Sequence, residues 1–242
     1  MLSRKPWGVS ETAVLCAAVF ATMLGSGLIA MANWGAGANA EFVQMMISLV
    51  FLQVAIFVWI TFFLRFNHTG WIEAFGLGLS EPATAVAYGV LTGALFLPAG
   101  LVLQKVSEVI MQLVHLTPEA QAAVKELQNP NLSLQDKLIF GVAAIFVAPI
   151  WEEAFFRGIL YPLIKQLGFP RLALWGTSAV FAIMHANEET LLPLLVFALA
   201  LVYLYETFEN LLAPIAAHSL FNTANFLILL FQDKIEHFLR VT

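Results

Sequence analysis

Two adjacent glutamates and an arginine stand inside a long apolar part of the chain. Glu152, Glu153 and Arg157 lie between uncharged runs at residues 138–147 and 158–164. On a helix, Glu153 and Arg157 are four residues apart with the acid first, the favourable order for an ion pair. Glu152 is rotated by about 100° from its neighbour and has no basic residue four positions later. One carboxylate can therefore be paired structurally while Glu152 stays available for chemistry.

Two histidines and an asparagine stand in other apolar runs of the second half of the chain. His185 closes one run, and His218 and Asn222 share a helical face in another because they are four residues apart. Removing all of these polar groups from water without a common purpose would be costly. We therefore expect them to converge with the glutamates on one site.

This set of side chains has the equipment to hydrolyse an amide bond. A glutamate and an imidazole can polarise a water, and a second imidazole with a carboxamide can donate hydrogen bonds to the oxyanion of a tetrahedral intermediate. Two alternatives stay open: the same groups could form a proton relay or transport path, or two histidines and a glutamate could bind zinc. The sequence has no His-Glu-x-x-His helix, and Asp136 and Asp233 lie outside the apolar runs.

Composition identifies the class of protein. The 242 residues are 60% hydrophobic and 11% charged, whereas a soluble domain carries about 25% charged residues. The net charge of −5 provides no basic surface for nucleic acid. The single cysteine, Cys16, cannot form an internal disulfide and is interpreted as a packing residue. The chain is predicted to be an all-α, multi-pass integral membrane protein whose first partner is the lipid bilayer.

The apolar runs predict about seven membrane spans, with six to eight compatible with the sequence. They cover residues 12–33, 42–66, 83–103, 133–166, 171–186, 191–205 and 211–231. The first run exceeds the 7–15 apolar residues of a signal peptide, so we expect an uncleaved helix. The third can continue as a more polar helix through Gln112. Ser133 is the expected cap of the fourth, which Pro149 and Pro162 could bend or break into two pieces.

These elements suggest one membrane domain over residues 1–242, with the active site inside the helix bundle. We divide it into N-terminal helices at 11–115, a polar connecting segment at 116–132 and catalytic helices at 133–232. Lysines and arginines are distributed over both predicted sides, so they hardly decide the orientation in the membrane.

Three motifs, taken in order, resemble those of a known family. They are Glu152-Glu153-x-x-x-Arg157, Phe181-x-x-x-His185 and His218-x-x-x-Asn222. Together they resemble the CAAX-protease and bacteriocin-processing (CPBP, also called Abi) intramembrane endopeptidases, which include the type II CAAX prenyl endopeptidase. The resemblance covers residues 133–231, while the first half of the chain is similar only in being made of hydrophobic helices.

The resemblance implies an endopeptidase that acts on a membrane-associated or lipidated protein or peptide. Its implied catalytic roles are a general base at Glu152 aided by His185, positioning groups at Glu153 and Arg157, and an oxyanion hole at His218 and Asn222. It implies no cofactor, and zinc held by Glu152, His185 and His218 is the alternative. The location we expect is the plasma membrane of a prokaryote.

Overall fold

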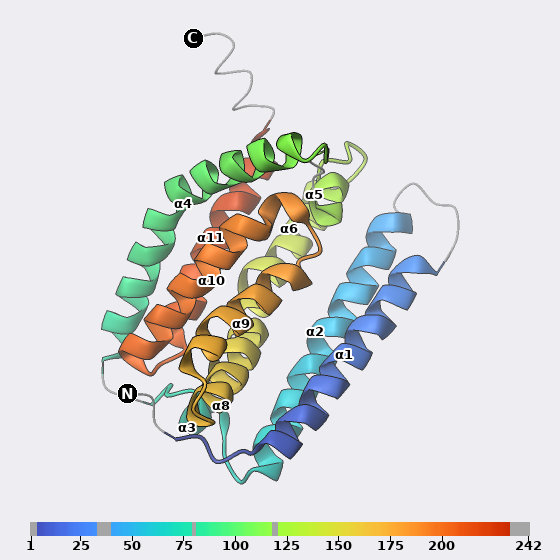
Figure 1. The fold of residues 1–242 in the computed structure, drawn as a ribbon. Helices are drawn as coiled ribbons and strands as arrows, with labels where there is room; N and C mark the ends of the chain where they lie inside the picture. The colour runs from blue at the N-terminus through green and yellow to red at the C-terminus, as the bar shows by residue number, and fades with distance from the viewer. Residues whose placement is uncertain (1–3, 33–39, 79–80, 118–120, 233–242) are drawn as a thin grey trace.

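The chain forms a bundle of helices, described here from a computed structural model (Figure 1). The structure describes residues 4–32, 40–78, 81–117 and 121–232, and these contain helices and turns but no strand. The helices are α1 (Val9–Met31), α2 (Ala40–Phe66), α3 (Trp71–Ala74), α4 (Pro82–Leu113), α5 (Ala122–Leu127), α6 (Leu134–Val142), α7 (Ala148–Glu153), α8 (Tyr161–Gln166), α9 (Pro170–Met184), α10 (Glu188–Phe208) and α11 (Leu212–Leu230), with π-helical segments η1 (Ala143–Val147) and η2 (Ala154–Leu160).

Within the described residues, six helical stretches are long and apolar enough to cross a membrane. They are Val9–Met31, Ala40–Phe66, Pro82–Leu113, Leu134–Gln166, Glu188–Phe208 and Leu212–Leu230. The run predicted at 171–186 is helical, but α9 has only 15 residues. At 1.5 Å per residue it is about 22 Å long, shorter than the hydrocarbon core of about 30 Å. The number of full-length spans therefore lies at the lower end of the predicted range.

The polar turn predicted before the sixth span is part of a helix. Asn187 caps α10, and its side-chain oxygen accepts a hydrogen bond from the backbone amide of Thr190 at 3.0 Å. The helix then runs from Glu188 to Phe208, past the predicted end at Tyr205. The prediction was wrong at both ends because charged residues in a first or last turn are compatible with a helix that leaves the apolar layer.

The fourth predicted span is a continuous helical rod with two π-helical segments. Ser133 caps it as expected, in a reciprocal capping box with Asp136. Pro149 and Pro162 do not break it, because each is the second residue of an α-helical segment that follows a π-helical one. Each proline, which has no backbone N–H, thus stands where the helix changes from π-helical to α-helical hydrogen bonding. At this position the missing hydrogen bond costs less than inside a regular α-helix.

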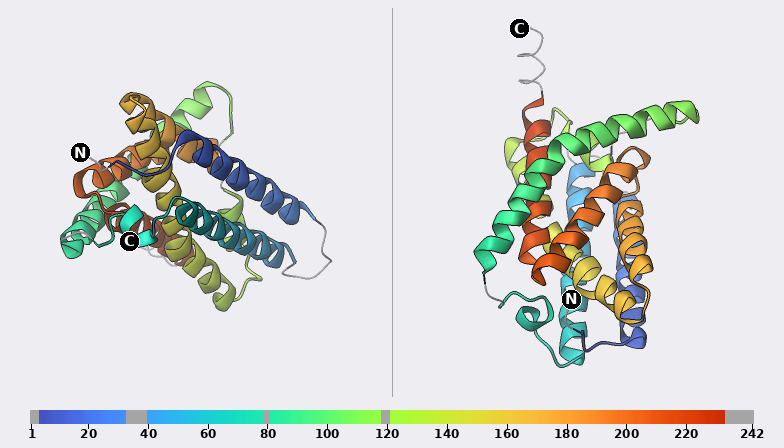
Figure 2. Two further views of the ribbon diagram at one scale, coloured as in Figure 1. Left: turned by 90° about the horizontal axis from the view of Figure 1, so that it is seen from below. Right: turned by 60° about the vertical axis from the view of Figure 1, so that its left-hand side comes forward.

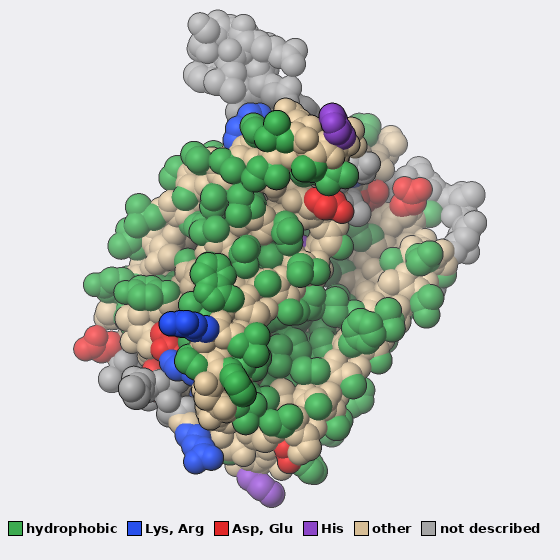
Figure 3. Space-filling view, in the orientation of Figure 1, with side chains coloured by type: hydrophobic (Ala, Val, Ile, Leu, Met, Phe, Trp, Pro, Cys, Tyr) green, Lys and Arg blue, Asp and Glu red, His purple; other side chains and the backbone are tan. Residues whose placement is uncertain are grey.

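The α1–α2 hairpin stands to one side of the other helices (Figure 2). Hydrophobic side chains cover most of the face in Figure 3, and the surface between α1 and α9 is hollowed and lined by them. Large exposed apolar side chains such as Val54, Phe62 and Leu95 are the surface that a membrane protein presents to lipid.

The segment before α1 fastens the lower end of the helical rod at residues 134–166. Lys5 is buried and its Nζ donates to the carbonyl of Ala74 at 2.6 Å, while its backbone amide donates to Gln166 Oε1 at 3.1 Å. Burial lowers the pKa of the Lys5 ammonium. The neighbouring ring of Phe75 packs on Gly158 in η2, where a Cβ would lie 2.5 Å from the ring. The site-bearing helix is therefore held from below by the N-terminal segment.

Close contact between α4 and α11 places the helix that carries His218. A Cβ built on Gly89 would lie 2.2 Å from the carbonyl oxygen of Ala213, and one on Gly93 would lie 2.8 Å from that of Ala217. Small residues of this kind let two membrane helices approach backbone to backbone.

We predict that Gly89→Ala lowers stability by about 1–3 kcal/mol because the added methyl group forces α4 and α11 apart. The matched control is Gly27→Ala in α1, where an added Cβ meets nothing within 4 Å. Thermal unfolding in detergent micelles measures both variants. Equal melting temperatures for the two would contradict the packing described for Gly89.

Candidate active site

A buried carboxylate at Glu153 joins three helices. Its Oε1 accepts from Arg157 Nη1 at 2.9 Å and contacts His218 Nδ1 at 2.8 Å. Arg157 Nη2 also donates to the carbonyl of Ala198 in α10 at 3.3 Å. The side chains of Glu153, Arg157 and His218 are at most 4% exposed. The ion pair expected from the spacing of Glu153 and Arg157 is therefore present, and it holds His218 as well.

The contact with Glu153 fixes which nitrogen of His218 carries a proton. A carboxylate only accepts hydrogen bonds, so Nδ1 of His218 is the donor. Its Nε2 then faces Glu152 Oε2 at 3.8 Å. That distance is longer than a hydrogen bond but short enough for strong electrostatic interaction. Of the two glutamates, Glu152 is the one with some access, at 14% exposed against 0% for Glu153.

The charges of this cluster balance only with one further proton. Two ionised glutamates and Arg157 sum to one negative charge, and buried charge without compensation is expensive. A proton on His218 brings the sum for Glu152, Glu153, Arg157 and His218 to zero. In that state Glu152 is an ionised base and Nε2 of His218 is a hydrogen-bond donor. A base and a hydrogen-bond donor are then present in one pair of side chains, Glu152 and His218.

Two carboxylate oxygens in the cluster are available to further donors. Oε2 of Glu152 and Oε2 of Glu153 are buried and have no hydrogen-bond partner among the described side chains and backbone groups. A buried acceptor without a donor is costly, so either atom gains by accepting from a water or a substrate amide.

His185 reaches the cluster through an aromatic ring. It follows the last residue of α9, and its Nδ1 contacts the carbonyl of Phe181 at 2.8 Å, which leaves Nε2 as the acceptor. The ring of Phe181 lies 4.8 Å from His185 and 5.7 Å from His218, centroid to centroid. The guanidinium carbon of Arg157 lies 4.4 Å from the centroid of that ring. Among the described contacts, Phe181 rather than Glu152 is the partner of His185.

Asn222 takes the place of a missing backbone donor. Its amide nitrogen donates to the carbonyl of Ala144 at 2.8 Å. In η1 the amide of Ala148 bonds the carbonyl five residues back, at Ala143, so the next amide, at Pro149, would bond Ala144. Proline has no N–H. Asn222 therefore satisfies the carbonyl that Pro149 leaves open, and one of its two amide hydrogens is used in doing so.

Sequence reasoning assigned no role to two residues that shape the site. Phe181 begins the Phe-x-x-x-His motif, and its place one turn before His185 was the available signal. Gln53 of α2 is 4% exposed and donates to the carbonyl of Ala143 at 3.3 Å. A glutamine in the middle of an apolar span was the signal there, because such a side chain needs a buried partner.

The donors proposed for zinc do not form a ligand set. Within the described part of the chain, no group of three or more His, Cys, Asp or Glu side chains is arranged to hold a metal ion. A zinc site needs at least three protein ligands around one point. Nε2 of His218 faces Glu152 at 3.8 Å, but His185 is not grouped with these two side chains, so a third ligand is not in place. We therefore derive no step through a metal ion.

Comparison with known proteins identifies the region that contains this cluster. Residues 134–224 match the family model of the type II CAAX prenyl endopeptidases described as Rce1-like. The matched region includes every residue of the three motifs. Searches of the curated proteins and of the solved structures found no match. Residues 134–224 are thus similar to an Rce1-like type II CAAX prenyl endopeptidase domain, and they lie in a chain whose apolar helices make it an integral membrane protein.

Proposed function

We propose that this protein is an intramembrane endopeptidase in which Glu152 activates the attacking water. The observation that supports this most strongly is the contrast between the two glutamates. Glu153 is wholly buried with two charged or polar partners, whereas Glu152 is partly accessible and faces Nε2 of His218 at 3.8 Å. Of the two glutamates, only Glu152 combines a partly exposed side chain with a carboxylate oxygen that has no hydrogen-bond partner and faces Nε2 of an imidazole, which is what a general base needs.

The proposed reaction uses the side chains in these positions. Glu152 takes a proton from water as the oxygen attacks the carbonyl carbon of the scissile peptide bond. The carbonyl oxygen becomes an oxyanion, which accepts hydrogen bonds from Nε2–H of His218 and from the second amide hydrogen of Asn222. The C–N bond then breaks, and the proton held by Glu152 passes to the leaving nitrogen. The carboxylic acid so formed gives its proton to the amine, leaving a carboxylate and an ammonium, and Glu152 is ionised again.

His185 and Phe181 are proposed to define the wall of the site nearest the end of α9. With Nδ1 on the Phe181 carbonyl, Nε2 of His185 can accept from the attacking water and assist Glu152. The hollow between α1 and α9 is apolar (Figure 3). Such a surface suits a substrate that arrives from the bilayer, and the family match suggests a lipidated C-terminal peptide as its class.

We predict that Glu152→Gln reduces cleavage of a prenylated Cys-a-a-X peptide to background while the protein stays folded, because glutamine cannot accept the proton from water. The control is Glu73→Gln, which removes an exposed carboxylate from α3. Liquid chromatography with mass spectrometry follows the tripeptide product from purified protein in lipid vesicles. Cleavage by Glu152→Gln at the parent rate would refute the assignment of the base.

The same assay distinguishes glutamate-activated hydrolysis from zinc-dependent hydrolysis. Glutamate-activated hydrolysis is expected to continue after treatment with a chelator, and loss of activity that zinc restores would favour the zinc alternative.

We predict that Glu153→Gln, unlike Glu152→Gln, lowers the stability of the fold. This change leaves the guanidinium of Arg157, 1% exposed, without its carboxylate partner. Breaking a buried ion pair by removing one member typically costs about 3–5 kcal/mol. Thermal unfolding should therefore show a large loss of stability for Glu153→Gln and little for Glu152→Gln. Equal stabilities would mean that the two carboxylates do not have the separate roles described.

A further inference from the structure

Helix α4 is too long to remain within the membrane. α4 has 32 residues, about 48 Å at 1.5 Å per residue, which exceeds the hydrocarbon core by about 18 Å. Pro98 stands inside it, near the middle. Figures 1 and 2 show the helix bent, with its second half running across the upper end of the bundle. We call residues 99–113 the elbow segment.

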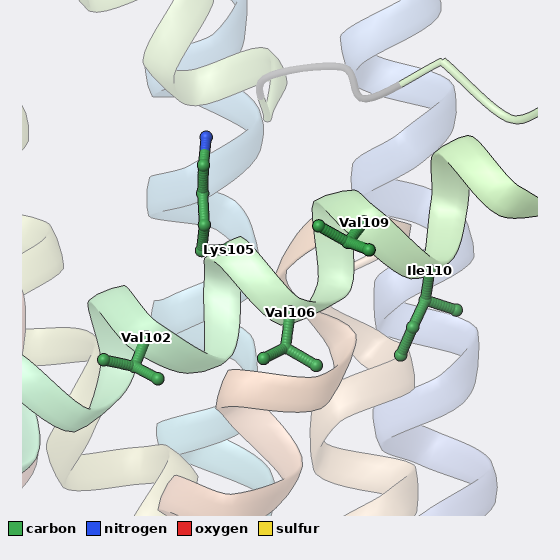
Figure 4. A pocket seen from close by; sticks show the side chains of 5 residues that line it. All are labelled: Val102, Lys105, Val106, Val109 and Ile110. Atoms are coloured by element: carbon green, nitrogen blue, oxygen red, sulfur yellow. The ribbon is translucent and has the colours of Figure 1, made fainter.

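The elbow segment has three distinct faces. Ser107 and Met111 are buried against the bundle. An apolar face is exposed and forms a shallow hollow, lined by Val102, Val106, Val109 and Ile110 with the stem of Lys105. In Figure 4 the side chain of Lys105 points away from those of Val106 and Ile110. A helix with an apolar and a charged exposed face is suited to a boundary between lipid and water.

The inner face connects the elbow segment to the active-site end of the bundle. Gln104 donates to a carboxylate oxygen of Glu189, and the hydroxyl of Ser107 donates to the carbonyl of Glu188 at 3.4 Å. These two acceptors begin α10, three and four residues after His185. Whatever fixes the depth of the elbow segment in the membrane therefore also fixes the loop that follows His185.

We propose that the elbow segment lies in the membrane interface with its valine face on lipid acyl chains, and so holds the His185 end of the site at the level of the lipid head groups. The apolar face continues the exposed apolar surface of the first half of α4, which includes Val90, Leu91 and Leu95. Lys105 is paired with Glu108 at 2.6 Å and carries its charge outward. The pairing leaves no net basic patch, so apolar burial rather than attraction to anionic lipid holds the segment in place.

The single cysteine makes the test direct. In a Cys16→Ser background, one thiol is introduced by Val106→Cys or, as the neighbouring control, by Lys105→Cys. Each is labelled with an environment-sensitive fluorophore, and the protein is placed in phosphatidylcholine vesicles. The label at position 106 should show blue-shifted emission and strong quenching by lipids that carry a nitroxide on the acyl chain. The label at 105 points away from Val106 (Figure 4) and should show a smaller blue shift and weaker quenching.

Two outcomes would overturn this proposal. One is equal emission and quenching at both positions. The other is a blue-shifted emission at position 106 that is lost when the protein is diluted to one copy per vesicle. A second copy of the protein, and not lipid, would then cover the valine face.

A third labelled position tests the link to the site. Glu188 is exposed, and a label introduced there by Glu188→Cys reports the depth of the loop after His185. Adding Val102→Asp and Val106→Asp should move this label away from head-group quenchers. An unchanged quenching profile would show that the elbow segment does not set the depth of the loop.

A different observation points to a positioning residue in α2, in an inference that rests on the proposed function. Gln53 and Asn222 donate to the consecutive carbonyls of Ala143 and Ala144, from helices α2 and α11. The first π-helical turn is thus held by two side-chain amides. We infer that Gln53 fixes this turn and, through it, the orientation of the Asn222 amide toward the oxyanion.

We predict that Gln53→Met lowers kcat for the prenylated peptide by about tenfold with KM nearly unchanged, since small displacements of a catalytic donor cost rate rather than binding. The matched control is Gln44→Met, because Gln44 stands on the same helix but donates to the carbonyls of Ile29 and Ala30 in α1. Gln53→Glu keeps a donor only while its carboxyl is protonated, so its rate relative to the parent should recover toward acidic pH.

These variants separate the inference from the proposed function. Equal kcat values for Gln53→Met and Gln44→Met, or a Gln53→Glu rate that stays parallel to the parent at every pH, would refute the positioning role. A parent protein that cleaves no peptide would instead refute the proposed function.

Discussion

The buried carboxylate of Glu153 is the interaction on which the site depends. An ionised group with no exposure survives only if its partners compensate for the lost hydration. Glu153 has two such partners, Arg157 one turn along the same rod and His218 on α11. The same contact ties the rod to α11, and Arg157 extends it to the backbone of α10. An electrostatic requirement within one helix thereby fixes the relative positions of three.

The close helix contacts follow from that requirement. His218 can reach Glu153 only if α11 is held at a set depth, and Gly89 and Gly93 let α4 lie directly against its backbone. Phe181 then fills the space between the two imidazoles and the guanidinium. Because these contacts are apolar or charge-balanced, the interior is closed around Glu153. Glu152, on the next face of the same helix, is left partly accessible.

The sequence predicts the parts of this site that depend on helical spacing. Glu153 and Arg157 pair because residues four apart share a face, and the acid–base order is favourable. The helices are recognisable because apolar runs of about 20 residues have few other uses. Pro149 could have bent or broken the helix, and the helix continues through it for a reason that spacing cannot reveal. A proline in a helix is tolerated if the register widens and another group takes the free carbonyl, and here that group is Asn222, seventy-three positions away in the sequence.

The roles of Asn222 and Gln53 illustrate why the remaining features need the fold. Each is a carboxamide in an apolar helix, so the sequence shows that it must have a partner but not which one. In the structure both partners are carbonyls of η1, the turn that leads into the two glutamates. A π-helical turn is costly by itself, and two amides from opposite sides offset that cost. The defect that lets the rod accommodate Pro149 is therefore also the element that connects the N-terminal hairpin and α11 to the helix of Glu152. Structural tolerance of the proline and the attachment of α2 and α11 to this helix thus depend on neighbouring hydrogen bonds of the same turn.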